Sequence, residues 1–211
     1  MDYERLRKEY RDSTLRRVDL DPHPIDFFKR WFGEAEKAGL CLPDAMTLAT
    51  TGADGAPNAR MVVLRGVDER GFVFYTSRES AKGRELERDP RAALVFHWNE
   101  MGRQVRARGN VEQMPFEESA RYFRTRPRES QLSAAVSPQS VVIESREQLE
   151  SQARNLEKRL GQRPVPVPEH WAGYRLAPNE IEFWQGRESR LHDRFRYVRA
   201  AGGWTMERLA P

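Results

Sequence analysis

Four charged or imidazole side chains lie within five residues near the carboxyl end of the sequence. The stretch EFWQGRESRLHDRF, residues 182–195, places Arg190, His192, Asp193 and Arg194 directly after an apolar segment. Such a density suits a site that holds an anion and orients an aromatic ring, because arginine and histidine supply several donors in a small volume. A solvated loop in an arginine-rich protein has the same composition, so other segments must decide between the two.

A second group of residues favours a phosphate site. Arg60 and Arg65 bracket one predicted strand, Tyr75 and Thr76 end the next, and Lys82 opens the helix that follows. Backbone N–H groups and the helix dipole favour an anion at a helix N-terminus. Arg60 and Arg65, five residues apart on an extended chain, are expected on opposite faces of the strand. The same residues could form a solvated strand end, and the sequence leaves both possibilities open.

A third cationic group is the segment RTRPRESQ, residues 124–131, which follows Tyr122. Two separate anion sites, a tryptophan at the end of a strand (Trp184) and the RLHDR cluster together suggest two phosphorylated ligands that lie close to each other.

Other kinds of chemistry have weaker support. The four histidines, at positions 23, 97, 170 and 192, lie tens of residues apart without metal-ligand spacing, so no metal site is expected. No GxSxG motif of a serine hydrolase occurs. Nucleic-acid binding stays open as an alternative, although the predicted strand at residues 71–77 lacks the glycine-bracketed aromatic pattern of an RNA-recognition strand. It is not expected.

The composition bounds the class of protein. The chain has 211 residues and a formal charge of +4, with its basic residues scattered among 32 acidic ones rather than gathered in a tail. The single cysteine, Cys41, excludes an internal disulfide and fits a reducing compartment. No apolar run approaches the roughly 18 residues that span a bilayer. We therefore expect a soluble cytoplasmic protein with no membrane partner.

The spacing of apolar residues predicts the elements that must position these side chains. Residues 1–22 are polar and end at two prolines, which indicates a charged N-terminal arm, and residues 23–211 are expected to form a single domain. A helix is expected from Ile25 to near Gly39. Further helices are expected at 80–87, after Pro115 and after Ser145. Strands are expected at 45–51, 59–66, 71–77, 91–98 and 103–114, and in the segments GYRLAP, EIEFWQG, RFRYVRA and WTMERLA.

About nine strands in mostly adjacent, antiparallel order predict a mainly β protein, a small β-barrel with peripheral helices. A parallel doubly wound sheet is excluded, because the strands come in runs instead of alternating with helices and no glycine-rich phosphate loop follows the first strand.

These segments resemble the pyridoxine (pyridoxamine) 5′-phosphate oxidase family. The likeness extends in order through RKEY, RMVVLRG, VFYTS, YFRTRPRESQ, SPQS, EFWQGRESRLHDRF and ERLAP, and so covers nearly the whole chain. The resemblance implies an antiparallel FMN-binding split barrel that forms a homodimer, with FMN in clefts between the subunits. It also implies oxidation of pyridoxamine or pyridoxine 5′-phosphate to pyridoxal 5′-phosphate with O2 as the electron acceptor and H2O2 as a product.

The resemblance also implies roles for particular residues. Arg190 and His192 match positions that lie against the pyridine ring and are the expected catalytic residues. The positions that match FMN contacts are Arg60, Met61, Val62, Val63, Leu64, Arg65, Tyr75, Thr76, Lys82, Gln104, Gln139, Ser140, Trp184 and Arg194. The positions that match substrate contacts are Arg7, Lys8, Glu9 and Tyr10 of the arm, which closes over the substrate, together with Arg65, Tyr122, Arg126, Ser130, Arg190, Leu191 and His192.

The density of the RLHDR cluster then has an explanation. On an extended chain Arg190, His192 and Arg194 share one face and can serve both ligands, while Asp193 on the other face is expected to pair with a neighbouring arginine.

Three positions depart from the family pattern. Arg65 stands where the family usually has lysine, Ala81 where many members have arginine, and Leu42 at a position that is often acidic. Arg65 keeps the charge but with a planar fork, and Ala81 removes one possible phosphate contact, which should weaken FMN binding by about 1 to 2 kcal/mol. A flavin- or pyridoxal-phosphate-binding protein without oxidase activity therefore stays open as an alternative.

Overall fold

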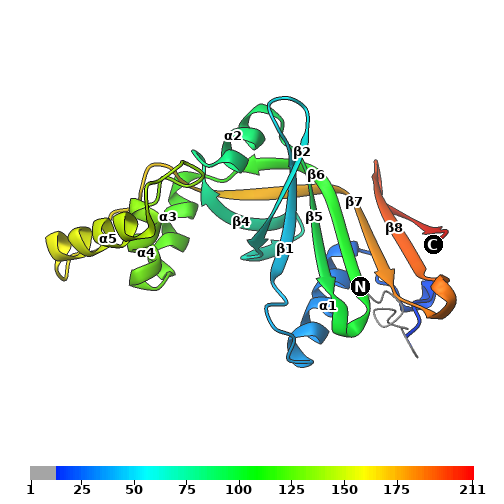
Figure 1. The fold of residues 1–211 in the computed structure, drawn as a ribbon. Coiled ribbons are helices and arrows are strands. Elements are labelled where there is room, and N and C mark those ends of the chain that lie inside the picture. The colour runs from blue at the N-terminus through cyan, green and yellow to red at the C-terminus, as the bar shows by residue number, and fades with distance from the viewer. Residues whose placement is uncertain (1–12) are drawn as a thin grey trace, which may run out of the picture.

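A computed structural model describes residues 13–211 of the chain (Figure 1). The helices are α1 (Pro24–Lys37), α2 (Ala81–Arg88), α3 (Phe116–Thr125), α4 (Arg128–Val136) and α5 (Arg146–Leu160). The strands are β1 (Ala45–Thr51), β2 (Pro57–Val63), β3 (Gly66–Asp68), β4 (Gly71–Ser77), β5 (Arg91–Trp98), β6 (Arg103–Gln113), β7 (Trp171–Gln185), β8 (Asp193–Ala200) and β9 (Gly203–Leu209). Three short 3₁₀ turns span Arg17–Asp19, Asn99–Met101 and Glu188–Arg190.

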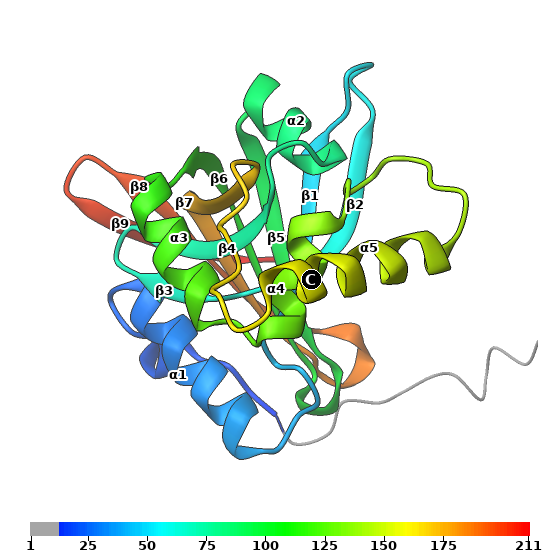
Figure 2. The same ribbon diagram turned by 90° about the vertical axis from the view of Figure 1, so that its left-hand side faces the viewer.

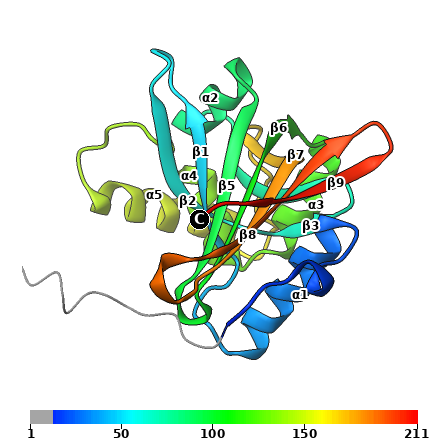
Figure 3. The same cartoon turned by 90° about the vertical axis from the view of Figure 1, so that its right-hand side faces the viewer.

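All nine strands form one antiparallel sheet that curls into a half-barrel. The order is β2-β1-β5-β6-β7-β4-β3, and β8 joins at β7 and carries β9 (Figure 3). The longest strand, β7, changes partner along its length: its first half pairs with β4 and its second half with β8, while β6 follows it on the other edge. β7 is therefore the strand that joins β4 and β3 to β8 and β9.

Helix α1 fills the concave side of the half-barrel. Its apolar residues recur at three- and four-residue spacing, which gathers them on one face. The Phe28 ring, fully buried, lies 4.9 Å from the rings of both Phe72 and Phe96, measured between centroids. Phe27 lies 4.5 Å from Phe183 in the same way. These contacts join α1 to β4, β5 and β7, so the helix closes the main core.

A second, smaller apolar cluster holds α3 and α4 against the start of β7. Phe123, Leu132, Val165 and Trp171 form its buried part. These helices and α5 project from the half-barrel on the side that faces the viewer in Figure 2. The cluster fixes the end of α3, and with it the residues that follow Phe123.

The register of β6 and β7 shifts between Arg108 and Gly109: Arg108 stands opposite Glu180 and Gly109 opposite Pro178, so Asn179 forms a bulge in β7. The backbones approach closely here: a Cβ added to Gly109 would lie 2.0 Å from the carbonyl oxygen of Ala177. Only glycine fits such an approach, since real side chains do not come so near a backbone oxygen.

Several expectations are confirmed and some are wrong in detail. The helices at α1, α2, α3 and α5 and the mainly antiparallel half-barrel are confirmed. GYRLAP and EIEFWQG are not separate strands but one, β7, because the chain runs on through Pro178 beside the bulge. The strand expected to reach Gly66 ends at Val63, and α4 was not expected. Within residues 13–22, Leu15 is 3% exposed and its N–H donates to Asp193, so this part of the expected arm contacts the domain.

None of the helices among the described residues is both long enough and apolar enough to cross a membrane.

The close approach at the bulge gives a test of the fold. Gly109→Ala should lower the free energy of unfolding by about 2 to 3 kcal/mol, because the new methyl group must displace backbone. Urea unfolding followed by circular dichroism measures the change. Gly202→Ala is the matched control, since a Cβ at Gly202 meets nothing within 4 Å. Equal midpoints for the two variants would contradict the close approach.

Candidate active site

A cavity of about 280 Å³ lies where β2, β4, α2 and α3 meet. Four cationic side chains line it, Arg60, Arg65, Lys82 and Arg126. The other lining residues are Met61, Val62, Val63, Tyr75, Thr76, Tyr122, Gln139 and Trp171. A concentration of positive charge in one small cavity is unfavourable unless an anion balances it. The composition of its walls therefore favours an anionic ligand.

Arg126 is the cation with the fewest protein partners in this cavity. Its guanidinium lies over the Trp171 ring, 4.4 Å from the centroid, and Trp171 in turn stacks in line with Tyr75. In the part of the chain that the structure describes, its Nη1 atom is buried without a hydrogen-bond partner. Burial lowers the pKa of Arg126, and the nearby charge of Arg65 lowers it further. A buried donor of this kind costs free energy unless a ligand accepts its hydrogen bond.

Helix α2 presents Lys82 at the other side of the cavity. Ser80 caps the helix by accepting a hydrogen bond from the N–H of Gly83, which fixes the first turn at the end of β4. The Lys82 Nζ atom donates to the side chains of Gln139 (2.8 Å) and Thr76 (3.3 Å). Burial and then the charge of Arg60 lower the pKa of Lys82. An anion in the cavity would stabilise the charged form of Lys82 and so raise its pKa.

Arg65 leaves the strand end and turns toward the same cavity. Its side chain pairs with Asp44 at 2.9 Å, and its N–H donates to the carbonyl of Val73. Because β2 ends at Val63, the alternation expected to place Arg60 and Arg65 on opposite faces does not hold, and both line one cavity. That expectation was wrong, and the reason is the bend after Val63.

The remaining expected residues lie at the far end of β7. Gln104, Trp184 and Arg194 stand opposite one another on β6, β7 and β8, so their side chains share one face of the sheet. The Arg194 Nε atom donates to Glu182 at 2.9 Å, and Glu182 is 3% exposed. The buried carboxylate of Glu182 thus holds the Arg194 side chain next to Trp184.

The turn between β7 and β8 carries Arg190 and His192. The expected two-residue alternation required an extended chain here, and that expectation was wrong. Glu188–Arg190 form a 3₁₀ turn in which Ser189 and Arg190 have φ near +54° and +60°. Arg190 and His192 therefore do not share a strand face. Asp193 pairs with Arg187 at 3.2 Å and with Arg208 at 3.1 Å, which confirms its expected role as an arginine partner.

The hydrogen bond of His192 sets which ring nitrogen carries the proton. Its Nδ1 atom accepts a hydrogen bond from the N–H of Arg187 at 3.0 Å, so in the neutral ring the proton lies on Nε2. Its ring centroid lies 4.6 Å from that of Trp184. Burial, then the charges of Arg190 and Arg194, lower its pKa. His192 is thus a neutral Nε2–H donor next to an aromatic face.

The residues that line the cavity and the residues around the turn after β7 are far apart within one chain. Trp171, at the start of β7, lines the cavity, whereas Trp184 lies thirteen positions later on the same strand. Thirteen residues of strand span roughly 40 Å. Figure 1 shows the same separation, with α3 and α4 on the left and the turn after β7 at the right-hand edge. One chain cannot bring both groups to one small ligand.

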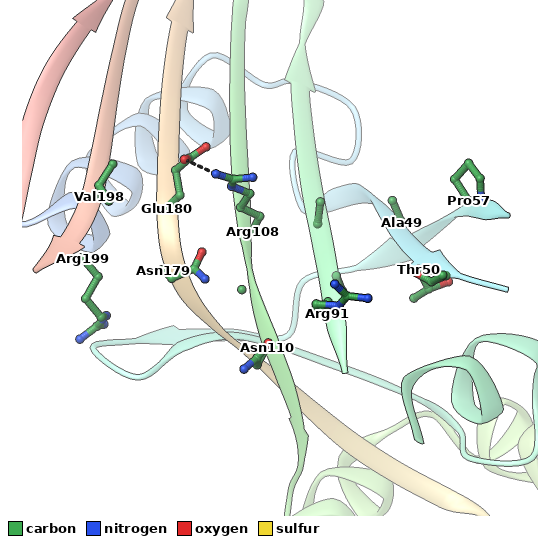
Figure 4. A pocket seen from close by; sticks show the side chains of 14 residues that line it. Ala49, Thr50, Pro57, Arg91, Arg108, Asn110, Asn179, Glu180, Val198 and Arg199 are labelled. Atoms are coloured by element: carbon green, nitrogen blue, oxygen red, sulfur yellow. Dashed lines mark hydrogen bonds and ion pairs between the residues drawn. The ribbon is translucent and has the colours of Figure 1, made fainter. Parts of the chain in front are cut away.

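A larger cavity of about 680 Å³ on the outer face of the sheet is a weaker candidate (Figure 4). Three arginines line it, but each has protein partners: Arg108 pairs with Glu180 at 2.7 Å, Arg91 with Asp89 at 2.7 Å, and Arg199 lies 4.7 Å over the Trp204 ring. Cations already neutralised or stacked in this way have little to gain from an anionic ligand.

The described residues 13–211 contain no group of three or more histidine, cysteine, aspartate or glutamate side chains that could hold a metal ion.

The structure therefore divides the residues predicted from the sequence. Arg60, Arg65, Tyr75, Thr76, Lys82, Gln139, Tyr122 and Arg126 come together with Met61, Val62 and Val63. Leu64 is instead a core residue, 7% exposed. Gln104, Trp184, Arg190, Leu191, His192 and Arg194 lie at the opposite end. Ser130 lies on α4 and Ser140 in the following loop. Arg7, Lys8, Glu9 and Tyr10 lie outside the described residues.

Sequence reasoning missed Asp44, Glu85 and Trp171. Glu85 holds Arg60 through an ion pair of 2.8 Å. Its position three residues after Lys82 on the same helix was the available signal, because residues three apart share a helix face.

Comparison with known proteins decides the family. Residues 32–160 match the model described as pyridoxamine 5′-phosphate oxidase, and residues 171–211 match the pyridoxine 5′-phosphate oxidase C-terminal dimerisation region. A pyridoxine/pyridoxamine 5′-phosphate oxidase of Rubrobacter xylanophilus is 54% identical over 98% of this chain and 95% of its own length. One of the same name from Salinibacter ruber is 52% identical over 98% and 97%. The chain belongs to the pyridoxamine 5′-phosphate oxidase family.

Solved structures agree with this assignment. PhzG from Burkholderia lata 383, in complex with tetrahydrophenazine-1-carboxylic acid, is 32% identical and superposes with a TM-score of 0.89 over 94% of this chain and 98% of its own. A pyridoxamine 5′-phosphate oxidase-related, FMN-binding protein from Nostoc punctiforme, 18% identical over 87% of this chain and 97% of its own, has a TM-score of 0.71 and supports the fold alone. Membership confirms the family resemblance, the split-barrel fold and the prediction of an oxidoreductase.

The tautomer of His192 can be tested directly. Long-range ¹H–¹⁵N NMR should show the proton on Nε2 and a pKa below 6.5. Arg190→Gln should raise this pKa by removing a neighbouring positive charge, whereas Arg190→Lys, which keeps the charge, should change it little. Because the folded state prefers the neutral ring, its contribution to stability is full above pH 6.5 and is lost as pH falls through the lowered pKa. A proton on Nδ1, or a pKa above 6.5, would contradict the assigned hydrogen bond.

Proposed function

We propose that the protein oxidises pyridoxamine 5′-phosphate, pyridoxine 5′-phosphate or both to pyridoxal 5′-phosphate, with FMN as cofactor and O2 as electron acceptor. The observation that carries the proposal is the cationic cavity with its unpartnered, buried Arg126 nitrogen in a chain more than 50% identical to oxidases of that name. Both the cofactor and the substrates are phosphate esters of aromatic ring systems, which need cations at one end and flat contacts at the other.

The residues of the cavity fit the phosphate end of FMN. Arg60 and Lys82 supply charge, and Thr76 supplies a hydroxyl at the first turn of α2, where the helix dipole also favours an anion. About 280 Å³ is small for a whole mononucleotide, so further walls must come from elsewhere. The FMN contacts that we propose are Arg60, Met61, Val62, Val63, Leu64, Arg65, Tyr75, Thr76, Lys82, Gln104, Gln139, Ser140, Trp184 and Arg194.

Tyr122, Arg126 and Ser130 are proposed to hold the phosphate of the substrate. The Tyr122 ring stacks on that of Tyr75, with centroids 3.9 Å apart, which fixes the hydroxyl end of each ring relative to the cavity. A guanidinium held over the Trp171 ring can donate to a phosphate without losing further side-chain freedom. The substrate is thus fixed by its far end, which places its ring for reaction.

The chemistry of electron transfer would come from FMN, which would accept a hydride equivalent from the 4′ carbon of the substrate and return the electrons to O2 as H2O2. Pyridoxine 5′-phosphate would give the aldehyde directly, whereas pyridoxamine 5′-phosphate would give an imine that water hydrolyses to the aldehyde with release of ammonia. The protein supplies position and charge. Arg190 and His192 are proposed to lie against the pyridine ring, where the Nε2–H of His192 can donate to a ring substituent and the positive charge of Arg190 can favour electron-rich atoms. Leu191, 70% exposed in one chain, would contact the substrate between them.

We propose that the protein acts as a homodimer, because one chain cannot bring the two groups to the same ligand. The cavity and the turn after β7 lie at opposite ends of a strand, so one copy of the chain must complete the site of the other. The region matched as a dimerisation region, residues 171–211, contains Trp184, Arg190, His192 and Arg194. In a two-fold dimer the same exchange occurs twice and gives two equal sites. The arm residues Arg7, Lys8, Glu9 and Tyr10 remain proposed substrate contacts.

A second candidate function is binding of flavin or pyridoxal phosphate without oxidase activity. The departures from the family pattern at Arg65, which lines the cavity, and at Ala81, the first residue of α2, leave it open. The Burkholderia PhzG structure holds a tetrahydrophenazine acid instead of a pyridoxine derivative, so that compound is a useful comparison substrate.

The proposed activity has a direct test. The purified protein should be yellow, and adding pyridoxamine 5′-phosphate in air should release H2O2 and form pyridoxal 5′-phosphate. Arg190→Ala combined with His192→Ala should lower kcat/KM by at least about a hundredfold while leaving the FMN content near that of wild type. Absorption spectra and a peroxidase-coupled assay measure the two quantities.

Replacing Arg187, an arginine of the same turn that pairs with Asp193, by lysine serves as the matched control and should retain most activity. Bound FMN without H2O2 release would support the second candidate, and a colourless protein that binds no FMN would contradict both.

The shared site can be tested by mixing two inactive variants. Arg126→Ala removes one half-site and Arg190→Ala with His192→Ala removes the other, so each homodimer should be nearly inactive. Dissociated and reassociated as an equal mixture, half of the dimers carry one intact site, and roughly a quarter of the wild-type activity should return. No gain over the separate variants would show that both groups act within one chain.

A further inference from the structure

Glu85, on α2, is the residue that most directly controls the position of Arg60. Its carboxylate is 9% exposed and accepts three hydrogen bonds: from Thr50 Oγ1 at 2.6 Å, from Asn58 Nδ2 at 2.9 Å and from Arg60 Nη2 at 2.8 Å. Arg60 also donates to the Thr50 hydroxyl and to the carbonyl of Leu48. The guanidinium is therefore held by both a strand and a helix.

The arrangement is built by the register of β1 and β2. Thr50 stands opposite Asn58, and Leu48 stands opposite Arg60, so all four side chains share one face of the hairpin. Helix α2 brings the carboxylate to this face. The helix cannot shift easily, because a Cβ added at Gly83 would lie 2.2 Å from the carbonyl oxygen of Arg78. The carboxylate thus has a fixed place above the strand pair.

The charge state of Glu85 agrees with this role. Burial alone would raise its pKa, but the hydrogen bonds from Thr50, Asn58 and Arg60 outweigh burial and lower the pKa below its ordinary value. A buried carboxylate is costly unless it is paired and hydrogen-bonded, and here both conditions are met. Its charge also counteracts the effect of Arg60 on Lys82, whose pKa it raises.

We propose that Glu85 is a positioning residue for the FMN phosphate, holding the Arg60 guanidinium at the wall of the cationic cavity. The inference rests on the proposed function, because it takes the phosphate of FMN as the ligand of Arg60. A carboxylate at an anion site weakens attraction by its charge, but it removes the freedom of a long side chain that would otherwise have to be ordered on binding. If positioning dominates, removing the Glu85 carboxylate should weaken FMN binding. If charge repulsion dominates, removing it should strengthen FMN binding.

The test compares FMN with riboflavin, which lacks the phosphate. Cofactor-free wild-type, Glu85→Ala and Glu85→Gln proteins are titrated with each flavin, and the quenching of flavin fluorescence gives the dissociation constants. Glu85→Ala should weaken FMN binding about tenfold and leave riboflavin binding within about twofold. Glu85→Gln should weaken FMN binding by a smaller factor, since its amide oxygen can still accept one hydrogen bond. Glu87→Ala, an exposed glutamate of the same helix, is the matched control.

A double-mutant cycle shows whether Glu85 acts through Arg60. In an Arg60→Ala background, Glu85→Ala should have almost no further effect on FMN affinity, because the group that it positions is gone. A purely structural role would leave the effect of Glu85→Ala undiminished and would weaken riboflavin binding equally. Circular dichroism of each cofactor-free protein checks folding, and if Glu85→Ala does not fold, Glu85→Gln carries the same comparison.

The outcomes are distinct. FMN affinity at or above the wild-type value in the folded variant, equal losses for both flavins, or no coupling to Arg60 would each overturn the inference alone. A wild-type protein that binds no FMN would overturn the proposed function, and the inference with it.

Discussion

The length of β7 is the constraint on which the rest of the structure depends. One strand of fifteen residues runs from the aromatic cluster beneath Arg126 to the turn that carries His192, and its two halves pair with different strands. The bulge of β7 at Asn179 and the close backbone approach at Gly109 let β6 stay paired along the whole of the bend. The chain thereby keeps two sets of functional side chains rigid but about 40 Å apart along the strand. A strand of this length keeps its two ends apart, so the residues at the two ends cannot contact the same small ligand within one chain.

Three of the four cations of the cavity are held in two different ways, and each way suits a different demand. Arg60 is held by the buried carboxylate of Glu85 and Arg65 by the half-exposed Asp44, whereas Arg126 lies on the Trp171 ring. The carboxylates fix orientation but reduce the net charge that a ligand meets. The aromatic contact fixes orientation and keeps the whole charge, at the cost of a buried donor with no protein partner. Arg126 is consequently the residue with most to gain from a bound phosphate.

Local sequence patterns predicted the elements well and their joints poorly. The apolar periodicity of α1 and the strand pattern of β1 at residues 45–51 are local signals, and both elements formed where expected. The continuity of β7 through Pro178 depends on pairing with β6 and β4, which no local pattern contains. The same holds for the site: the cluster around Lys82 could be anticipated from strand ends and a helix start, but the Glu85 contact with Arg60 depends on how α2 packs on the hairpin. The left-handed backbone at Arg190 had no local signal at all.

The departures from the family pattern are best understood through contacts rather than alignment. Leu42 occupies the position that the resemblance gives as often acidic; it is 69% exposed, has a positive φ of 53° and does not line the cavity. The carboxylate stands two residues later, at Asp44, where it pairs with Arg65, the residue that replaces the usual lysine. A guanidinium reaches farther than an ammonium group can and presents two donors in a plane, so it can contact Asp44 with one edge while another faces the cavity. At position 65 the chain thus places an arginine that is held by a carboxylate of the same chain and still lines the cavity.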